Sequence, residues 1–189
     1  MEKIAASGIR CVVLREKDLS SNEYDELAIS VSALCQKHNV RFIAHTFCET
    51  ALKLDVPVHL PCDVFKNFSQ EHEKNRDIQS DISQRTFGVS VHSPEQASAA
   101  EKAGASWLIG GHVFETKSKE GLEGRGPGFL SAVCKVSKVP VYAIGGINRK
   151  NIGLIAKSGI AGVCLMSSLM QSPDPQMLVE ELLAVAASC

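Results

Sequence analysis

The 189-residue sequence contains no apolar run that approaches the roughly 18 residues from which a membrane-spanning helix is recognised. Its first seven residues, Met1 to Ser7, are too few and too polar for a secretory signal. It also lacks an excess of charge, because 20 Lys and Arg balance 21 Asp and Glu to a net charge of −1. We therefore expect a cytoplasmic protein that binds neither membranes nor nucleic acid through a general surface charge.

Paired cysteine motifs are absent as well. The seven cysteines include no CxxC pair, their number is odd, and most of them lie among apolar residues. This pattern predicts reduced core cysteines in place of a disulfide framework or a zinc site. The cysteines are residues 11, 35, 48, 62, 134, 164 and 189.

The composition is that of an ordinary globular protein, with 44% apolar and 22% charged residues. This length favours one domain over residues 1–189. Seven short apolar segments, typical of strands, alternate with helical patterns along the chain. We expect strands at 9–14, 40–44, 56–60, 87–91, 107–109, 139–144 and 162–166, and helices at 20–39, around 51–52, and at 94–104, 129–136, 148–159 and 174–187.

Helix ends are marked by capping residues. Ser20 followed by Glu23, and Ser93 followed by Pro94, each predict the first turn of a helix. Gly104 predicts a helix end. The segment 62–84 carries many charges without a clean period, and there we expect a loop and one irregular helix.

Alternating strands and helices predict a parallel sheet, either open and doubly wound or closed into a TIM (β/α)8 barrel. No GxGxxG follows the first strand, and polar residues follow nearly every strand, which favours the barrel with its site at the carboxyl ends of the strands. Only seven strands are legible, so either the barrel lacks its first β-strand or another segment closes the gap. We expect incomplete closure at that seam, with residues 1–6 forming a remnant helix or helping to cover the gap.

The loop from Gly110 to Gly126 is dense in ionisable side chains between glycines. His112 lies two residues into it, and an imidazole can take and return a proton near neutral pH. We interpret His112 as a candidate catalytic residue, and the alternative is a structural loop histidine.

Two further groups of residues are candidates for anion binding. Gly145-Gly146 and Met166-Ser167-Ser168 follow consecutive strands and offer backbone N–H groups where barrels commonly bind phosphate, although paired glycines also permit close packing. Arg15 and Lys17 follow the first legible strand. They either hold a second anionic group or form surface ion pairs with Glu16 and Asp18.

The chain resembles the thiamine phosphate synthase superfamily, and within it the thiazole tautomerase branch. The resemblance is carried by GHVFETKSKEGLEGRG, with FGVSVHSPEQA before it and VPVYAIGGI and GVCLMSS after it, and it covers residues 8–185. It implies a (β/α)8 barrel whose first strand is missing here. It also implies an isomerase that aromatises a carboxylated thiazole phosphate by proton transfer, with no cofactor and no metal.

The resemblance further implies roles for individual residues. His112 matches the proton shuttle of the tautomerases. The thiazole phosphate site is matched by Gly145, Gly146, Met166 and Ser167, and Ser168 adjoins it. Positions facing the ligand are matched by Thr116, Ser118 and Lys119, which we expect to bind the substrate carboxylate.

Synthases of the superfamily bind a pyrimidine pyrophosphate and Mg²⁺ through a Gln-x-Arg-x-Lys strand end, an Asn-Asp pair and a further Asp. Arg15 and Lys17 are kept here, but Val13 replaces the Gln, His45-Thr46 replace Asn-Asp, and Pro61-Cys62 occupy the third region. Since Mg²⁺ prefers carboxylate oxygens, synthase activity is not expected. His45-Thr46-Phe47 departs from the tautomerase pattern too.

Three functions are therefore weighed. The leading expectation is a thiazole tautomerase that binds the small-molecule thiazole phosphate carboxylate. The resemblance also implies a homodimer. The alternatives are a thiamine phosphate synthase, which is a transferase, and a non-catalytic regulator that senses a thiamine precursor.

Overall fold

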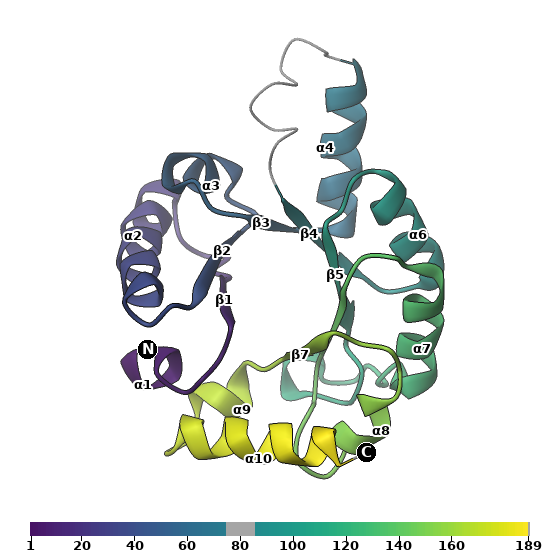
Figure 1. The fold of residues 1–189 in the computed structure, drawn as a ribbon. Coiled ribbons are helices and arrows are strands. Elements are labelled where there is room, and N and C mark those ends of the chain that lie inside the picture. Colours follow the sequence, from purple (N-terminus) through teal and green to yellow (C-terminus); the bar gives the residue numbers. More distant parts are fainter. Residues whose placement is uncertain (75–85, 189) are drawn as a thin grey trace.

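Seven short parallel strands form the centre of the molecule, in a computed structural model that describes residues 1–74 and 86–188. Each strand pairs with the next one along the chain, so the spatial order is the sequence order (Figure 1). The strands are β1 (Cys11–Leu14), β2 (Arg41–His45), β3 (Val58–Pro61), β4 (Phe87–Val91), β5 (Trp107–Gly111), β6 (Val141–Ile144) and β7 (Gly162–Cys164).

The sheet curls but does not close. Within the described residues β1 pairs only with β2 and β7 only with β6, which leaves a seam between the first and last strands. This curled, seven-stranded arrangement is a TIM-barrel-like fold that lacks one strand. The fold expected from the sequence is confirmed.

Helices cover the convex face of the sheet (Figure 1). A turn of 3-10 helix, η2 (Lys117–Lys119), lies in the loop after β5. The α-helices are α1 (Glu2–Ala5), α2 (Ser21–Lys37), α3 (Cys48–Leu54), α4 (Cys62–Lys74), α6 (Pro94–Lys102), α7 (Gly126–Val136), α8 (Ile152–Ala156), α9 (Ser167–Met170) and α10 (Pro175–Ala187). None of the described helices is long and apolar enough to cross a membrane.

The predicted caps are present. Ser20 and Glu23 form a reciprocal capping box at the start of α2, and the Ser93 hydroxyl accepts a hydrogen bond from the Gln96 N–H at the start of α6. Gly104 has φ +96° just after α6, in the region that favours glycine.

Two helix predictions need correction. Helix α8 begins at Ile152, not at 148, because Asn148 folds back: its N–H donates to Asn151 Oδ1 (2.7 Å) and its Oδ1 accepts from the Lys150 N–H (2.9 Å). Such side-chain bonds compete with helical ones. The segment 62–74 is one regular helix, α4, while the remainder of the predicted loop at 75–85 lies outside the described residues.

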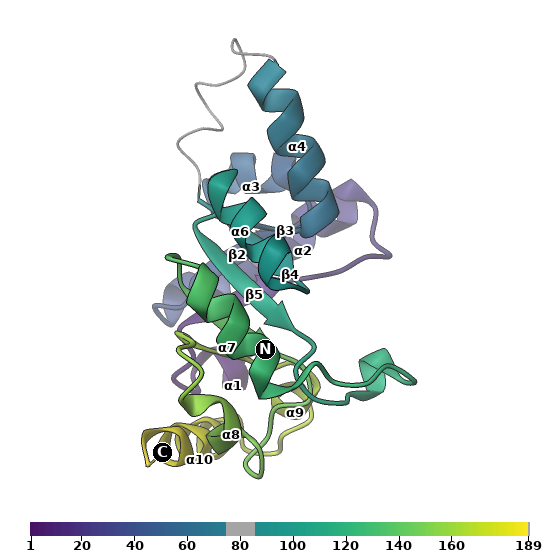
Figure 2. The same ribbon diagram turned by 90° about the vertical axis from the view of Figure 1, so that its right-hand side faces the viewer.

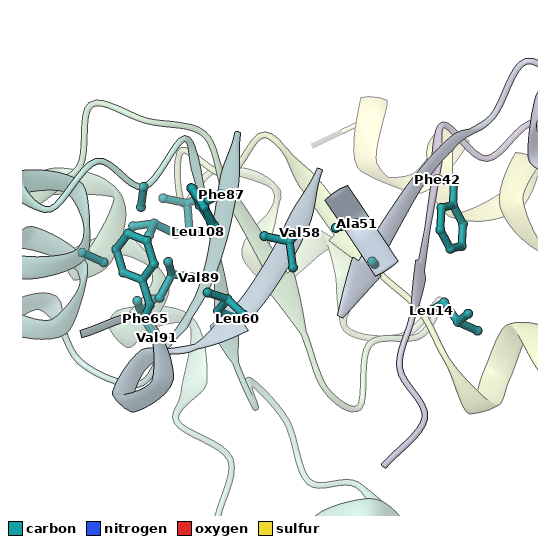
Figure 3. Packing of buried hydrophobic residues seen from close by; sticks show 14 of the residues in the cluster. Leu14, Phe42, Ala51, Val58, Leu60, Phe65, Phe87, Val89, Val91 and Leu108 are labelled. Atoms are coloured by element: carbon teal, nitrogen blue, oxygen red, sulfur yellow. The ribbon is translucent and has the colours of Figure 1, made fainter. Parts of the chain in front are cut away.

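The hydrophobic core lies between the sheet and its helices. Alternate strand residues such as Val58, Leu60, Val89 and Leu108 are almost fully buried and pack against helical side chains such as Phe65 (Figure 3). The intervening strand residues line the concave lumen of the curled sheet. The described cysteines are all free, but only Cys35 among them is buried and Cys11 is exposed, so the prediction that they are core residues needs correction.

Helix α1 lies beside the open seam, where it contacts both α2 and α10 (Figure 1). Its Ile4 and Ala5 are buried. Glu2 forms an ion pair with Lys37 (2.7 Å) at the end of α2 and is hydrogen-bonded to His38 Nε2 (2.9 Å). The first residues thus form a short helix that helps to cover the seam.

A buried tyrosine ties the ends of the first two strands together. The Tyr24 hydroxyl donates to the Leu14 carbonyl (2.8 Å) and accepts from the His45 N–H (3.0 Å). The ring is fully buried and stacks on Phe47 at 3.8 Å between centroids. One side chain therefore satisfies two backbone groups at the carboxyl edge of the sheet.

Tyr24→Phe is expected to lower the free energy of unfolding by about 1–3 kcal/mol, because it leaves both backbone groups buried without partners. Urea unfolding of the variant and the wild type measures the difference. Tyr142→Phe is the matched control, since the Tyr142 hydroxyl makes no hydrogen bond to a described residue. Equal losses in the two variants would contradict this role of Tyr24.

Candidate functional site

The carboxyl ends of the seven parallel strands meet at one edge of the sheet. Most residues that the sequence singled out follow directly after a strand end at this edge. Arg15 follows β1, His45 ends β2, His112 follows β5, Gly145 follows β6, and Met166 comes soon after β7. We call this region the carboxyl edge.

Backbone pairing of β5 and β6 continues past the strands. The Val113 N–H donates to the Ile144 carbonyl (2.9 Å), and the Phe114 N–H donates to the Gly145 carbonyl (3.0 Å). A Cβ at Gly145 would lie only 2.5 Å from the His112 Cβ. The structure therefore places the candidate catalytic histidine directly against the predicted phosphate loop.

Close packing also explains why the second position of this loop, Gly146, is a glycine. Gly146 has φ +65°, and a Cβ there would collide with the Glu115 carbonyl and lie 2.8 Å from the Phe114 Cβ. Its own carbonyl accepts hydrogen bonds from Asn148 Nδ2 (3.1 Å) and Asn151 Nδ2 (2.9 Å). Both glycines are thus required by the contact between the two loops.

The same conformation leaves backbone donors unused. In the described part of the chain, the N–H groups of Gly145 and Gly146 have no acceptor. The Met166 and Ser167 N–H groups at the start of α9 also lack one there, and Met166 is 55% exposed. Neighbouring strands β6 and β7 therefore carry donors with which an anion can pair.

His112 is half-buried, and its Nε2 lies 3.3 Å from the Leu122 carbonyl oxygen. Its loop is closed at the base, because the Arg125 N–H donates to the His112 carbonyl (3.1 Å) and the Gly126 N–H donates to the Val113 carbonyl (2.8 Å). The loop holds the imidazole at the carboxyl edge through backbone bonds.

The other predicted loop residues lie farther out. The loop after β5 projects away from the body of the molecule (Figure 2). Ser118 and Lys119 are exposed in it, while Thr116 is half-buried next to Glu115, which touches the Gly146 loop. The structure brings Thr116 towards the glycine loop but shows no contact of Ser118 or Lys119 with it.

His92 is a residue of this edge that the sequence did not select. Its Nδ1 lies 2.7 Å from the Gly111 carbonyl oxygen, and its N–H donates to Gln96 Oε1 (2.7 Å). It therefore ties the end of β4 to the end of β5, one residue before His112. In the sequence, the Ser93-Pro94 helix cap next to His92 indicated only a capping role for this histidine.

Arg15 and Lys17 are exposed beyond β1. Neither forms an ion pair with a described residue, including Glu16 and Asp18, so the alternative of a surface ion-pair network is not observed. Both cations act on His45, whose pKa they help to lower. Two positive charges without an ion-pair partner among the described residues therefore act on the end of β2.

Two buried histidines line the lumen between β2 and β4. His45 and His59 are 8% and 2% exposed, and their rings lie 5.6 Å apart. His59 Nε2 lies 2.8 Å from Ser90 Oγ, while its Nδ1 has no partner among the described residues. Trp107 packs at 6.2 Å from the His59 ring, over the space that Gly88 leaves without a side chain.

Burial keeps both imidazoles neutral. Desolvation, with the charges of Arg15 and Lys17, lowers the pKa of His45 to about 4. Desolvation, with the nearby His45, lowers the pKa of His59 to about 3. At neutral pH this part of the lumen offers uncharged hydrogen-bonding groups.

The described residues do not gather the donors that Mg²⁺ prefers. No group of three or more His, Cys, Asp or Glu side chains among residues 1–74 and 86–188 is placed to hold a metal ion. At the strand ends where synthases are expected to carry carboxylates, β2 ends in His45 and is followed by Thr46. β3 is followed by Cys62, whose thiol pKa is raised by burial, and then by one carboxylate, Asp63, in the first turn of α4. Directly after these two strand ends the chain thus offers a hard dication a single carboxylate.

Two hollows of the described surface lie outside the lumen. One, of about 280 Å³, is at the opposite edge of the sheet, between Cys134, Lys138 and Gly159. The other, of about 210 Å³, lies over α2 and α3 beside the Lys53–Asp25 ion pair. Neither hollow includes the residues at the carboxyl edge that the sequence singled out.

Comparisons with known proteins identify relatives. The profile of the family described as "Thiamine monophosphate synthase" matches residues 1–169. The chain is 29% identical to the thiamine-phosphate synthase of Chlorobium limicola, over 97% of this chain and 85% of that one. It is 32% identical to the thiamine-phosphate synthase of Geobacillus kaustophilus, over 89% and 76%.

A solved structure agrees with these relatives. The thiamine phosphate pyrophosphorylase from Pyrococcus furiosus superposes with a TM-score of 0.79 at 26% identity, covering 99% of this chain and 87% of that one.

These relatives overturn the leading functional expectation. The tautomerase prediction was wrong, because the relatives reported over most of the chain are named as thiamine-phosphate synthases. The prediction depended on the motif around His112. That loop lies against Gly145, whose N–H has no acceptor among the described residues, and this arrangement does not specify an isomerisation.

Gly146→Ala is expected to lower the free energy of unfolding by about 1–3 kcal/mol, because the added methyl group forces the two loops apart and strains a positive φ. Thermal or urea unfolding measures the loss. Gly128→Ala in α7 is the control: a Cβ there meets nothing within 4 Å, so a small gain is expected. A fully stable Gly146→Ala variant would refute the proposed packing.

Stability is expected to fall as the pH is lowered from neutrality to about pH 4. His45 and His59 have folded-state pKa values of about 4 and about 3, below the ordinary 6.5, so only the unfolded chain takes up these protons in that window. The loss is up to roughly 1.4 kcal/mol per pH unit for each histidine. Urea unfolding across the window checks the slope. His45→Gln should reduce the dependence of stability on pH by about the contribution of one histidine. An unchanged slope would argue against a neutral, buried His45.

Proposed function

The chain belongs to the thiamine monophosphate synthase family, and from this premise we propose that it is a transferase that joins two phosphorylated thiamine precursors. In that reaction a pyrimidine pyrophosphate and a thiazole phosphate combine into thiamine phosphate, and pyrophosphate leaves. The observation that supports the proposal is that unused backbone N–H groups and two unpaired cations lie on the same edge of the sheet.

The first group would bind the thiazole phosphate. Gly145, Gly146, Met166 and Ser167 contribute unused backbone N–H groups from two neighbouring strand ends, and Ser168 lies next to them in α9. Backbone donors around a phosphate need no side-chain charge. Their fixed positions, imposed by the glycine packing described above, orient the phosphate and thereby the thiazole ring.

The second group would bind the pyrophosphate of the pyrimidine substrate. Arg15 and Lys17 are exposed and form no ion pair with a described side chain, so both are free to contact an anionic ligand. A pyrophosphate gains charge as it leaves, so cations at this position stabilise the transition state more than the ground state. These two residues are accordingly proposed to promote departure of the leaving group.

His112 is proposed as a residue that contacts the bound thiazole, because it lies beside Gly145. Thr116, Ser118 and Lys119 extend from the same loop and are proposed to contact the substrates from the solvent side. In a transferase, they exclude water and orient the two rings.

The resemblance to synthases implies Mg²⁺, and directly after the ends of β2 and β3 the chain offers it one carboxylate, Asp63, but no cluster of three or more ligating side chains among the described residues. No step is therefore assigned to a metal. The neutral imidazoles at this position also favour a second candidate function, a non-catalytic protein that binds a thiamine precursor and signals through a partner.

Incubation of the chain with the pyrimidine pyrophosphate and the thiazole phosphate, with and without Mg²⁺, tests the proposal. We expect thiamine phosphate to form, and Lys17→Gln to reduce kcat/KM about tenfold or more by loss of a charge-assisted contact. Lys135→Gln, on the exposed face of α7, removes the same charge elsewhere and is expected to leave kcat/KM unchanged.

Binding of either precursor without any product under both conditions would reject the transferase and support the precursor-binding protein.

A further inference from the structure

We infer that His92 recognises the ring of the pyrimidine substrate, because its Nε2 accepts a hydrogen bond from the amino group of that ring. The inference rests on the proposed function and names one further residue that selects the pyrimidine. His92 directly follows β4, one strand before the strand that leads to His112.

The bond to Gly111 determines which ring nitrogen of His92 carries the hydrogen. His92 Nδ1 lies 2.7 Å from the Gly111 carbonyl oxygen. A carbonyl oxygen only accepts, so Nδ1 is the donor, and the neutral ring then has its free lone pair on Nε2. His92 is exposed, and its Nε2 has no partner among the described residues. The carboxyl edge therefore presents a hydrogen-bond acceptor at the end of β4.

Neighbouring bonds fix the position of this acceptor. The His92 N–H donates to Gln96 Oε1 (2.7 Å), and the Gln96 N–H donates to the Ser93 hydroxyl (3.2 Å), which caps α6. These bonds attach the backbone of His92 to α6, while the bond to Gly111 attaches its ring to β5. An acceptor held in this way loses little conformational freedom when it binds a ligand.

His92 lies between the two groups of candidate anion-binding residues along the sheet. The strand order follows the sequence, so β4 stands between β1, which leads to Arg15 and Lys17, and β6, which leads to Gly145. The lone pair on Nε2 pairs with an N–H group and not with a phosphate oxygen, which is itself an acceptor. A pyrimidine whose pyrophosphate lies at Arg15 and Lys17 extends towards the middle strands, where this acceptor meets its ring.

His112 has the opposite arrangement of ring nitrogens and a different neighbour. Its Nε2 lies 3.3 Å from the Leu122 carbonyl oxygen, so Nε2 is the donor and Nδ1 is the acceptor. His112 lies against Gly145, where the thiazole phosphate is proposed to bind. His92 is one strand farther from that loop, and the pyrimidine is accordingly the ring that we assign to it.

The chemistry of the substrate explains why an acceptor is useful here. In the pyrimidine half of thiamine, an amino group stands on the ring carbon next to the one that bears the reacting methylene group. When the bond between the methylene carbon and the pyrophosphate oxygen breaks, its electron pair leaves with the pyrophosphate. The positive charge that develops on the carbon is shared with the amino nitrogen, so its N–H donates more strongly to His92 in the transition state. The thiazole nitrogen supplies the electron pair of the new C–N bond, and no proton passes to His92.

Two amide substitutions separate the acceptor from the structural bond. Asn places its amide nitrogen near the position of Nδ1, so His92→Asn keeps a donor for the Gly111 carbonyl but has no acceptor at the position of Nε2. Gln reaches the position of Nε2 with its amide oxygen, so His92→Gln restores the acceptor and gives up the bond to Gly111. His38→Asn, between α2 and β2 at the opposite edge of the sheet, is the matched control.

Isothermal titration with two monophosphates tests the inference without turnover. One probe is the aminopyrimidine methyl monophosphate, and the other is the same molecule with hydrogen in place of the amino group. We expect the wild type and His38→Asn to bind the amino probe about tenfold or more tightly than the other probe, and His92→Asn to bind both alike. His92→Gln should regain part of the preference. An undiminished preference in His92→Asn, or no preference in the wild type, would overturn the inference.

Nitrogen-15 NMR of the histidine rings tests the wild-type chain directly. At about pH 8, above the ordinary histidine pKa, long-range spectra distinguish a ring with hydrogen on Nδ1 from one with hydrogen on Nε2. The signal missing from either His92 variant assigns the residue. We expect hydrogen on Nδ1, and a change in the Nε2 signal when the amino probe is added. Hydrogen on Nε2, or no change at saturation, would contradict the inference.

The inference and the proposed function fail separately. A preference for the amino probe that depends on His92, without thiamine phosphate synthesis, contradicts the transferase and leaves the inference standing. Synthesis by a chain whose preference does not depend on His92 contradicts the inference alone.

Discussion

Parallel pairing of the seven strands is the constraint on which the candidate site depends. It places every strand end at one edge, so that residues as distant in sequence as Arg15 and Ser167 share one side of the sheet. Pairing between β5 and β6 continues into their loops and holds His112 against Gly145. The site is thus an extension of the sheet.

Charged and neutral side chains lie in different parts of the carboxyl edge, and burial explains the difference. Side chains inside the lumen, His45 and His59, are kept neutral by desolvation, whereas Arg15 and Lys17 at the rim remain solvated and charged. The cations and backbone N–H groups at the rim can therefore pair with an anionic group. The uncharged side chains of the lumen can contact a neutral heterocyclic ring. This separation suits substrates in which a heterocycle carries a phosphate.

Much of the fold was predictable because its signals are local. Capping at Ser20 and Ser93, apolar strands, and glycines at helix ends each depend on a few neighbouring residues, and the structure confirms them. The late start of α8 was missed because two asparagine side chains replace helical bonds. The role of His92 was missed because its partner, the Gly111 carbonyl, is brought near only by strand pairing.

The reaction was the weakest prediction from the sequence, since the His112 motif indicated a tautomerase and the relatives are synthases. By itself, the sequence determined the strand order, the seven-stranded barrel and the residue types at each strand end, because these follow from local pattern and chain order. Tertiary structure alone decided that Gly146 must lack a side chain, that Arg15 and Lys17 stay unpaired, and that His45 and His59 lie side by side in the lumen. Those properties depend on packing between segments far apart in the chain, which no local pattern encodes.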